Sequence, residues 1–173
     1  EPTFRKLYGG VQPSKSRTVQ IMDNCGMLEN YAEIDKALAD LNGNAPAWRL
    51  SEETPIIEGF NQKLSRYMFF GNEATEPEGF TGLAPRYNTI TGVENKDHIF
   101  SGSVTGAGSN YTSIWLVVWG PNTVHMLYPK GSQAGLLVED KGQVTIENLN
   151  GDGGRMEAYR THYRWDAGMT VRD

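Results

Sequence analysis

The chain has 173 residues, of which 38% are hydrophobic and 10% aromatic, a composition typical of a folded globular protein rather than of a disordered chain. Its formal net charge of −5 argues against a dedicated nucleic-acid-binding protein, which would carry a basic patch or stripe. The single cysteine, Cys25, excludes an intrachain disulfide and a cysteine-based zinc cluster, and the longest apolar run, residues 114–119, is too short to span a bilayer.

The N-terminal part of the chain is predicted to be a loop followed by a short strand. The chain does not begin with Met and shows no basic and apolar leader, so we expect it to be a piece of a longer protein. Residues 1–16 are predicted to be loop, because Gly9-Gly10 and Pro13 interrupt regular structure. Arg17–Met22 alternates, with Val19 and Ile21 on one face, and predicts a strand.

Two helices are predicted next. The first is indicated by a helical spacing of apolar residues and by a C-terminal stop at Asn42-Gly43. Its spaced residues are Tyr31, Ile34, Leu38 and Leu41.

The second helix is predicted from Ser51 to about Gly71, which corresponds to roughly 30 Å at 1.5 Å per residue. Ser51 is the expected N-cap, and Glu52 and Glu53 would place negative charge in the first turn. Pro55 would fall early enough in the helix to be tolerated. One face is predicted to pack on a sheet, with an apolar stripe of Ile56, Phe60, Leu64 and Met68 that Ile57 and Tyr67 widen.

The rest of the chain is predicted to be loop and strand. Residues 75–109 are rich in Gly, Pro, Asn and Thr and are predicted to be loop. Strands are predicted at 113–119 and 124–128, as a hairpin around Gly120-Pro121-Asn122, and at 136–139 and 144–147. The clearest strand is 156–165, with Tyr159, Thr161, Tyr163 and Trp165 on one face and Arg160, His162, Arg164 and Asp166 on the other.

No residue is assigned to a catalytic, cofactor-binding or metal site. His98, His125 and His162 lie in separate segments without metal-ligand spacing, and Cys25 is expected to be a small buried residue. Residues 148–153 imitate the start of a calcium loop, but Tyr159 stands where that loop needs its twelfth-position glutamate. We therefore predict a hairpin turn over 148–154 without a tightly bound calcium ion.

The residues alone leave two alternatives from other functional classes open. An enzyme would need a site assembled from dispersed residues, around Asp97, His125 and His162. A carbohydrate-binding module could use a platform of Trp115, Trp119 and Trp165, although such residues more often fill a core or an interface. The polar strand face of Arg160, His162 and Arg164 is either a solvated sheet face or a salt-bridge seam between subunits.

Several stretches, in order along most of the chain, carry a resemblance to a known family. They are 31–43 (Tyr-Ala-Glu-Ile-Asp-Lys-Ala-Leu-Ala-Asp-Leu-Asn-Gly), 49–52 (Arg-Leu-Ser-Glu), 82–88 (Gly-Leu-Ala-Pro-Arg-Tyr-Asn), 112–125 (Thr-Ser-Ile-Trp-Leu-Val-Val-Trp-Gly-Pro-Asn-Thr-Val-His), 128–131 (Tyr-Pro-Lys-Gly), 159–166 (Tyr-Arg-Thr-His-Tyr-Arg-Trp-Asp) and 171–173 (Val-Arg-Asp). These stretches resemble the major capsid proteins of tailed bacteriophages and prophages. The long run around Trp-Gly-Pro-Asn-Thr-Val-His is much more specific than a short motif.

The resemblance implies an α+β chain with the shell-protein fold of tailed phages. In that fold a long spine helix and an antiparallel sheet form a peripheral domain, an axial domain clusters at the symmetry axes, and an extended loop overlaps the neighbouring subunit. Residues 1–16 would then be the end of the extended loop, and 17–88 a peripheral domain with its spine helix at 51–71. Residues 89–155 would be loops and β-hairpins that could include part of the axial domain, and 156–173 would be strands of the peripheral sheet.

The implied function is structural rather than enzymatic. The subunit would self-assemble into the icosahedral, DNA-containing head shell and need no cofactor. The implied partners are copies of the chain in pentamers and hexamers, with scaffolding, portal and decoration proteins as further candidates. The encapsidated DNA would be bound without sequence specificity, and no membrane is involved. The expected location is the virion, and the cytoplasm of the bacterial host during assembly.

Overall fold

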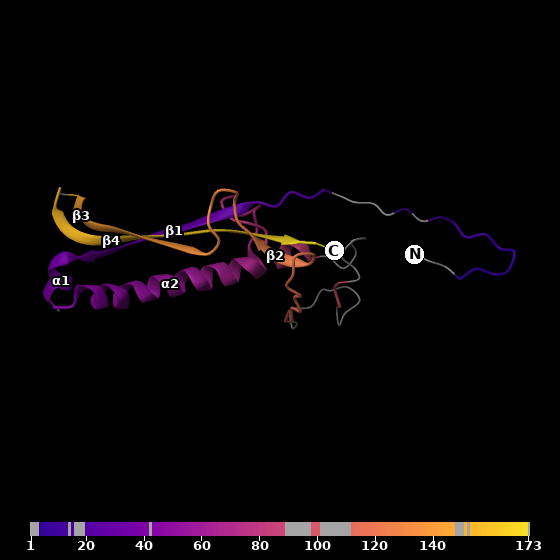
Figure 1. Ribbon diagram of the computed structural model, residues 1–173, viewed down its shortest axis with the longest axis horizontal. Coiled ribbons are helices and arrows are strands. Elements are labelled where there is room, and N and C mark those ends of the chain that lie inside the picture. The colour runs from indigo at the N-terminus through magenta and orange to yellow at the C-terminus, as the bar shows by residue number, and fades with distance from the viewer. Residues whose placement is uncertain are drawn as a thin grey trace.

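A long helix lies along one face of a narrow antiparallel sheet, and an extended N-terminal segment leaves the body at one end (Figure 1). The computed structural model describes residues 4–13, 15, 20–41, 43–88, 98–100, 112–147, 151 and 153–172. The elements are β1 (Cys25–Asp35), α1 (Lys36–Leu41), α2 (Ala45–Phe70), α3 (Leu83–Arg86), β2 (Val124–Leu127), β3 (Leu136–Glu147) and β4 (Arg155–Val171). None of the described helices combines the length and the apolar composition that crossing a bilayer requires.

Strand β4 is the centre of the sheet and pairs with all three other strands. β1 covers one of its edges, from Cys25 opposite Gly168 to Asp35 opposite Ala158. The other edge is covered by β3 and then by β2, which begins with Val124 opposite Val171. All three pairings are antiparallel. The predicted strand 156–165 is therefore confirmed, and it continues to Val171.

Helix α2 is the predicted long helix, but it begins earlier than expected. Its 26 residues correspond to about 39 Å at 1.5 Å per residue. The N-cap is Asn44, whose side chain accepts a hydrogen bond from the backbone N–H of Ala47 at 3.4 Å, and Pro46 lies in the first turn. The predicted N-cap Ser51 is wrong, because Asn44 and Pro46 provide the start signals instead. The helix passes Pro55 without ending.

The apolar stripe of α2 packs as predicted at Phe60 and Leu64, whereas Ile57, which was predicted to widen the stripe, is exposed. Phe60 and Leu64 are 6% and 7% exposed, and the helix is continuous through both residues. They belong to two core clusters against the sheet. One contains Ala32, Phe60 and Tyr163, and the other contains Leu64, Phe80, Leu83, Ala167 and Met169.

The first predicted helix is largely wrong. Residues 31–35 belong to β1, and only Lys36–Leu41 is helical. The pairing of β1 with β4 over eleven residues overrides the local helical spacing. The predicted end is confirmed, since α1 ends at Leu41 and Gly43 has a positive φ of 66°.

The other strand predictions are confirmed in part. The predicted strand at 17–22 is wrong for residues 20–22, which are not in a strand, whereas 17–19 lie outside the described residues. Residues 113–118 are likewise not in a strand, so β2 has no hairpin partner there and pairs with β4. The two short strands at 136–139 and 144–147 are one strand, β3, with a bulge between Asp140 and Gly142.

The connection between β3 and β4 joins adjacent antiparallel strands, with Glu147 opposite Arg155. Residues 148–150 and 152 of the predicted hairpin turn lie outside the described residues. The predicted loop at 75–109 contains one helical turn, α3, and its residues 89–97 and 101–109 also lie outside them. Cys25 was expected to be buried, and this is wrong: it is exposed at the first position of β1.

Candidate subunit-contact site

The residues proposed for a dispersed catalytic site do not come together. His125 lies opposite Thr170 in the sheet, whereas His162 lies opposite Tyr31. Thr170 and His162 are eight residues apart on β4, which corresponds to about 26 Å at 3.3 Å per residue. Asp97 lies outside the described residues. Across the described part of the chain, no group of three His, Cys, Asp or Glu side chains could hold a metal ion.

The three tryptophans proposed as a sugar platform do not share an open surface. Trp165 packs against both core clusters. Trp115 packs on the Leu64 cluster, and its ring centroid lies 6.2 Å from that of Phe69. Only Trp119 of the three is exposed. Two of the three side chains therefore take part in core packing, as aromatic residues most often do.

A partly buried polar cluster joins α2 to the sheet, and we call it the helix–sheet clamp (Arg49, Glu53, Asp140, Thr161 and Tyr163). Glu53 is 8% exposed, and its carboxylate accepts hydrogen bonds from the hydroxyls of Thr161 at 2.6 Å and Tyr163 at 2.7 Å. Burial, followed by the hydrogen bond to Glu53, raises the pKa of Tyr163 well above its usual range. The clamp fixes the position of α2 along β4.

Arg49 extends the clamp to the other edge of the sheet. Its guanidinium lies 2.9 Å from the Asp140 carboxylate and donates to the Thr161 hydroxyl at 3.0 Å. The hydrogen bond from Arg49 lowers the pKa of Asp140 and raises that of Arg49. The sequence prediction placed Glu53 in the first helical turn and so missed the clamp. The signal was present, because residues 53, 60 and 64 fall on one helical face.

The two arginines on the charged face of β4 have partners within the chain. Arg160 pairs with Glu33 at 2.6 Å, and Arg164 pairs with the buried Asp166 at 2.9 Å. His162 stacks on Tyr31 with ring centroids 4.5 Å apart. The buried Nε2 of His162 has no hydrogen-bond partner among the described residues, and a salt-bridge seam between subunits stays a prediction.

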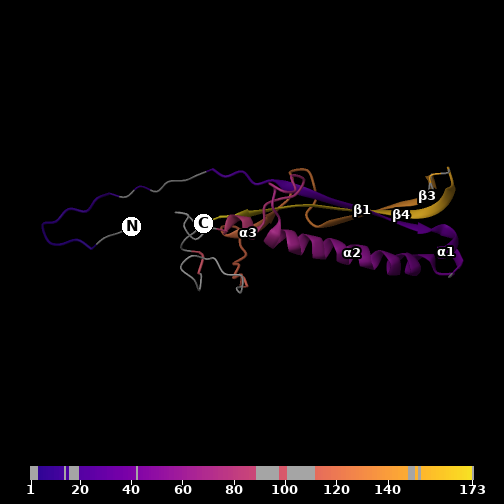
Figure 2. The ribbon, with the colours of Figure 1, turned by 180° about the vertical axis from the view of Figure 1, so that it is seen from behind.

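An extended segment at the N-terminal end projects from the body, and we call its described residues 4–13 the arm. Figures 1 and 2 both show the arm beyond the start of β1, at the end of the molecule opposite α1. Phe4, Leu7 and Tyr8 are 109%, 88% and 108% exposed. Tyr8 has a positive φ of 64°, and the N–H of Gly9 donates to the carbonyl of Lys6 at 3.0 Å, so the arm turns back at its tip.

The start of β1 is held by a separate polar cluster. Arg86, at the end of α3, lies 2.6 Å from the carboxylate of Asp23, which precedes β1. Arg86 also donates to the carbonyl of Met169 at 3.2 Å, and the side chain of Asn24 donates to Glu73. These contacts fix the direction in which the chain leaves β1. The sequence prediction did not identify them, because they join residues far apart in the chain.

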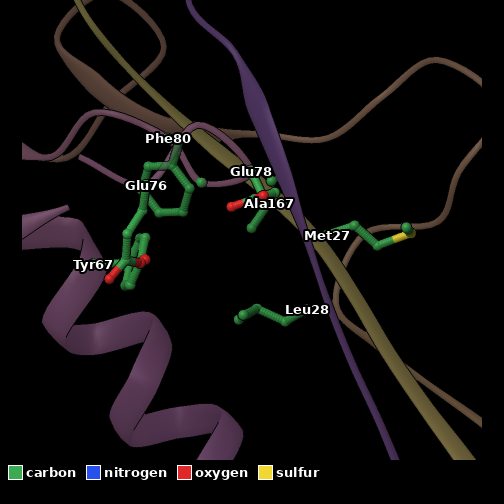
Figure 3. A pocket seen from close by; sticks show the side chains of 9 residues that line it. Met27, Leu28, Tyr67, Glu76, Glu78, Phe80 and Ala167 are labelled. Atoms are coloured by element: carbon green, nitrogen blue, oxygen red, sulfur yellow. The ribbon is translucent and has the colours of Figure 1, made fainter. Parts of the chain in front are cut away.

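A small apolar cavity of about 100 Å³ lies between β1, α2 and the segment 76–80. Leu28, Tyr67, Phe80 and Ala167 line it, with Glu76 and Glu78 at its rim, and we call it the β1–α2 cavity. Figure 3 shows Tyr67 and Phe80 close together beside α2, whereas Met27 points to the other side of β1. A second cavity of about 190 Å³ lies between α2, β2 and the segment 128–135.

The described elements form a long helix on a narrow antiparallel sheet, with an apolar arm projecting from it. The model of the family described as major capsid protein GP7 matches residues 1–173, and the chain belongs to this family. It is also similar to a chain in the structure of bacteriophage epsilon15, with 44% sequence identity and a TM-score of 0.60. That match covers 100% of this chain and 51% of the other, so the chain spans about half the length of that relative. The comparison with curated proteins finds no match. The fold predicted from the resemblance, that of tailed-phage capsid proteins, is confirmed.

Proposed function

We propose that the protein to which this chain belongs is the structural subunit of an icosahedral phage or prophage head, and that copies of it self-assemble into the DNA-containing shell. The observation that carries the proposal, beside the family, is the arm. A subunit that worked alone would gain nothing from exposing three large apolar side chains on a projecting segment, whereas such exposure is typical of an interaction surface.

The energetics favour assembly through the arm. Burying a side chain such as Phe, Leu or Tyr on association contributes about 1.5–3 kcal/mol, so Phe4, Leu7 and Tyr8 together would contribute roughly 5–9 kcal/mol per arm before the cost of association. Each subunit of a closed shell would give one arm and receive another. Many modest interfaces then produce a large collective stability.

The organisation of the chain supports a subunit with a peripheral and an axial domain. The described elements α2, β1, β3 and β4 would form the peripheral domain, with α2 as its spine helix. Within residues 89–155, the loops and hairpin segments outside β2 and β3 would belong in part to an axial domain that contributes to pentamers and hexamers. Scaffolding, portal and decoration proteins, and encapsidated DNA held without sequence specificity, are the further partners. The subunit would act in the virion and assemble in the host cytoplasm.

The test uses the full-length protein, expressed with and without scaffolding factors from the same phage. Size-exclusion chromatography and negative-stain microscopy should show capsomer-sized rings or closed particles. Replacing Phe4 and Leu7 by Ser should shift the protein toward monomers, whereas the matched control Leu41→Ser, at an equally exposed position on α1, should assemble normally. A full-length protein that stays monomeric at high concentration under both conditions would refute the proposal.

A further inference from the structure

The segment 113–118 leads into β2 and carries an unbroken run of apolar residues. From residue 114 to residue 119 every side chain is apolar, and all but Leu116 are β-branched or aromatic. A continuous run of this kind is typical of a strand that is buried on both faces, whereas a strand with one solvated face alternates apolar with polar residues. The composition of the segment therefore predicts that both of its faces are covered.

The described chain covers only one of these two faces. Trp115 and Val117 pack on the core cluster of Leu64. Successive side chains of an extended segment point to opposite faces, so the residues between them form the second face. Its side chains are Ile114, Leu116 and Val118, which are 93%, 95% and 65% exposed. A contiguous apolar surface of this kind marks a place where another element binds.

The backbone of the segment also lacks a partner strand. No backbone group of residues 113–117 is hydrogen-bonded to another backbone group of the described residues. Pairing begins only at the end of the segment, where the carbonyl of Val118 accepts from the N–H of Val124 at 3.4 Å. An extended segment with free N–H and C=O groups is a template for pairing with a further strand.

The C-terminal end of β4 lies beside this segment. The N–H of Arg172 donates to the carbonyl of Thr123 at 2.8 Å, and its guanidinium donates to the carbonyl of Pro121 at 3.4 Å. The hydroxyl of Thr123 in turn donates to the carbonyl of Val118 at 2.7 Å. The turn 119–123 therefore links residue 172 to the end of the segment, and a strand that followed residue 173 would start next to the free backbone.

We propose that, in the full-length protein, the chain that follows residue 173 pairs as a strand with residues 113–118 of the same copy and places an apolar element over Ile114, Leu116 and Val118. The epsilon15 chain has the length for this, since the match covers 100% of this chain and only 51% of that one. A second copy is the poorer occupant, because each free subunit would then expose the apolar face and the unpaired backbone before assembly. The inference concerns the folding of a single copy and goes beyond the proposed self-assembly.

Thiol labelling of the unassembled full-length subunit tests whether the face is covered. In a Cys25→Ser background without other cysteines, Leu116→Cys should react with a maleimide at least about tenfold more slowly than Leu41→Cys, because a covered thiol reacts only when the structure opens locally. Leu41, which is 83% exposed on α1, is the matched control. Equal rates at the two positions, before and after assembly, would overturn the proposal. Protection of residue 116 that arises only on assembly would also overturn it, since the occupant would then be a second copy, while the shell function would stand.

Photocrosslinking identifies the element that covers the face. A diazirine analogue of leucine at position 116 is activated in particles assembled from a mixture of isotope-labelled and unlabelled full-length subunits. Mass spectrometry should find residue 116 linked to a peptide from beyond residue 173, and both members of each linked pair should carry the same isotope. Links to residues 1–111 would show that this part of the chain covers the face itself, and pairs of mixed isotope would show a second copy. Either result, or the absence of any link to protein, would overturn the proposal.

Discussion

The helix–sheet clamp makes a quantitative prediction for Tyr163→Phe. The change removes one hydroxyl and keeps the ring, whose centroid lies 6.3 Å from that of Phe60. The lost hydrogen bond, 2.7 Å long, ends on a carboxylate that is 8% exposed. A hydrogen bond to a charged group contributes about 1.5–3 kcal/mol, so we expect the free energy of unfolding to fall by roughly 2 kcal/mol. In a urea titration of the unassembled full-length subunit, this corresponds to a midpoint lower by about 1 M for an m-value near 2 kcal/mol per molar.

The neighbouring Tyr159 provides the control. Its hydroxyl lies 3.4 Å from Asp40 in an exposed setting, so Tyr159→Phe should change the free energy of unfolding by less than about 0.5 kcal/mol. Equal effects of the two substitutions, or a loss below about 0.5 kcal/mol for Tyr163→Phe, would refute the assigned role of Glu53.

Alkaline pH tests the same contact. The pKa of Tyr163 is raised above its usual value of 10.0, so the folded state binds the phenolic proton more tightly than the unfolded state. That contribution is fully present below about pH 10 and is lost as the pH rises beyond it. The unmodified protein should therefore lose stability more steeply than Tyr163→Phe above this pH.

Three further substitutions test the core, the charged strand and the bulge. Phe60→Ala should lower the free energy of unfolding by about 3–5 kcal/mol in the same titration, because the buried ring leaves a cavity; a loss below about 1 kcal/mol would contradict its place in the core. The hydrogen bond from Arg164 lowers the pKa of Asp166 below its usual 3.8, so this carboxylate stabilises the fold above that pH and ceases to do so as the pH falls below it. Asp166→Asn should therefore make the free energy of unfolding depend less on pH in the acid range. An unchanged pH dependence would count against the contact. Gly142→Ala should cost roughly 1 kcal/mol, since its φ is 69°, whereas Gly154→Ala, which has open space around it, should be close to neutral.

The sequence could predict α2 because its signal is local. The apolar stripe recurs at helical spacing through Phe60 and Leu64, and the buried face follows from that spacing alone. The start of the helix was placed wrongly because Ser51 and Asn44 both precede plausible first turns. Asn44 caps the helix and Pro46 lies in its first turn, and the packed position of Glu53 agrees with this earlier start, since its carboxylate lies against β4 rather than at a helix terminus.

β1 could not be predicted in the same way, because its sequence fits both the helical and the strand periodicity. Tyr31 and Ile34 continue a helical spacing into α1, while Leu28, Ala32 and Ile34 lie on one face of a strand. The choice is made by β4, more than a hundred residues further along the chain, whose residues 158–168 pair with all of β1. A local sequence pattern carries no information about that partner strand. The split of β3 into two predicted strands has a related cause, because residues 140–142 resemble a turn and form a bulge.

The arm shows that a regular pattern alone does not identify an assembly surface. Phe4, Leu7 and Tyr8 stand at i, i+3 and i+4, the spacing of one face of a helix, but residues 4–13 are not helical and these side chains are exposed. Within a single subunit such a segment is indistinguishable from loop. Two structural facts separate them: Arg86 anchors the start of β1 through Asp23, whereas the apolar side chains of the arm are exposed. The exposed side chains are available to another molecule, as repeated contacts between identical subunits require.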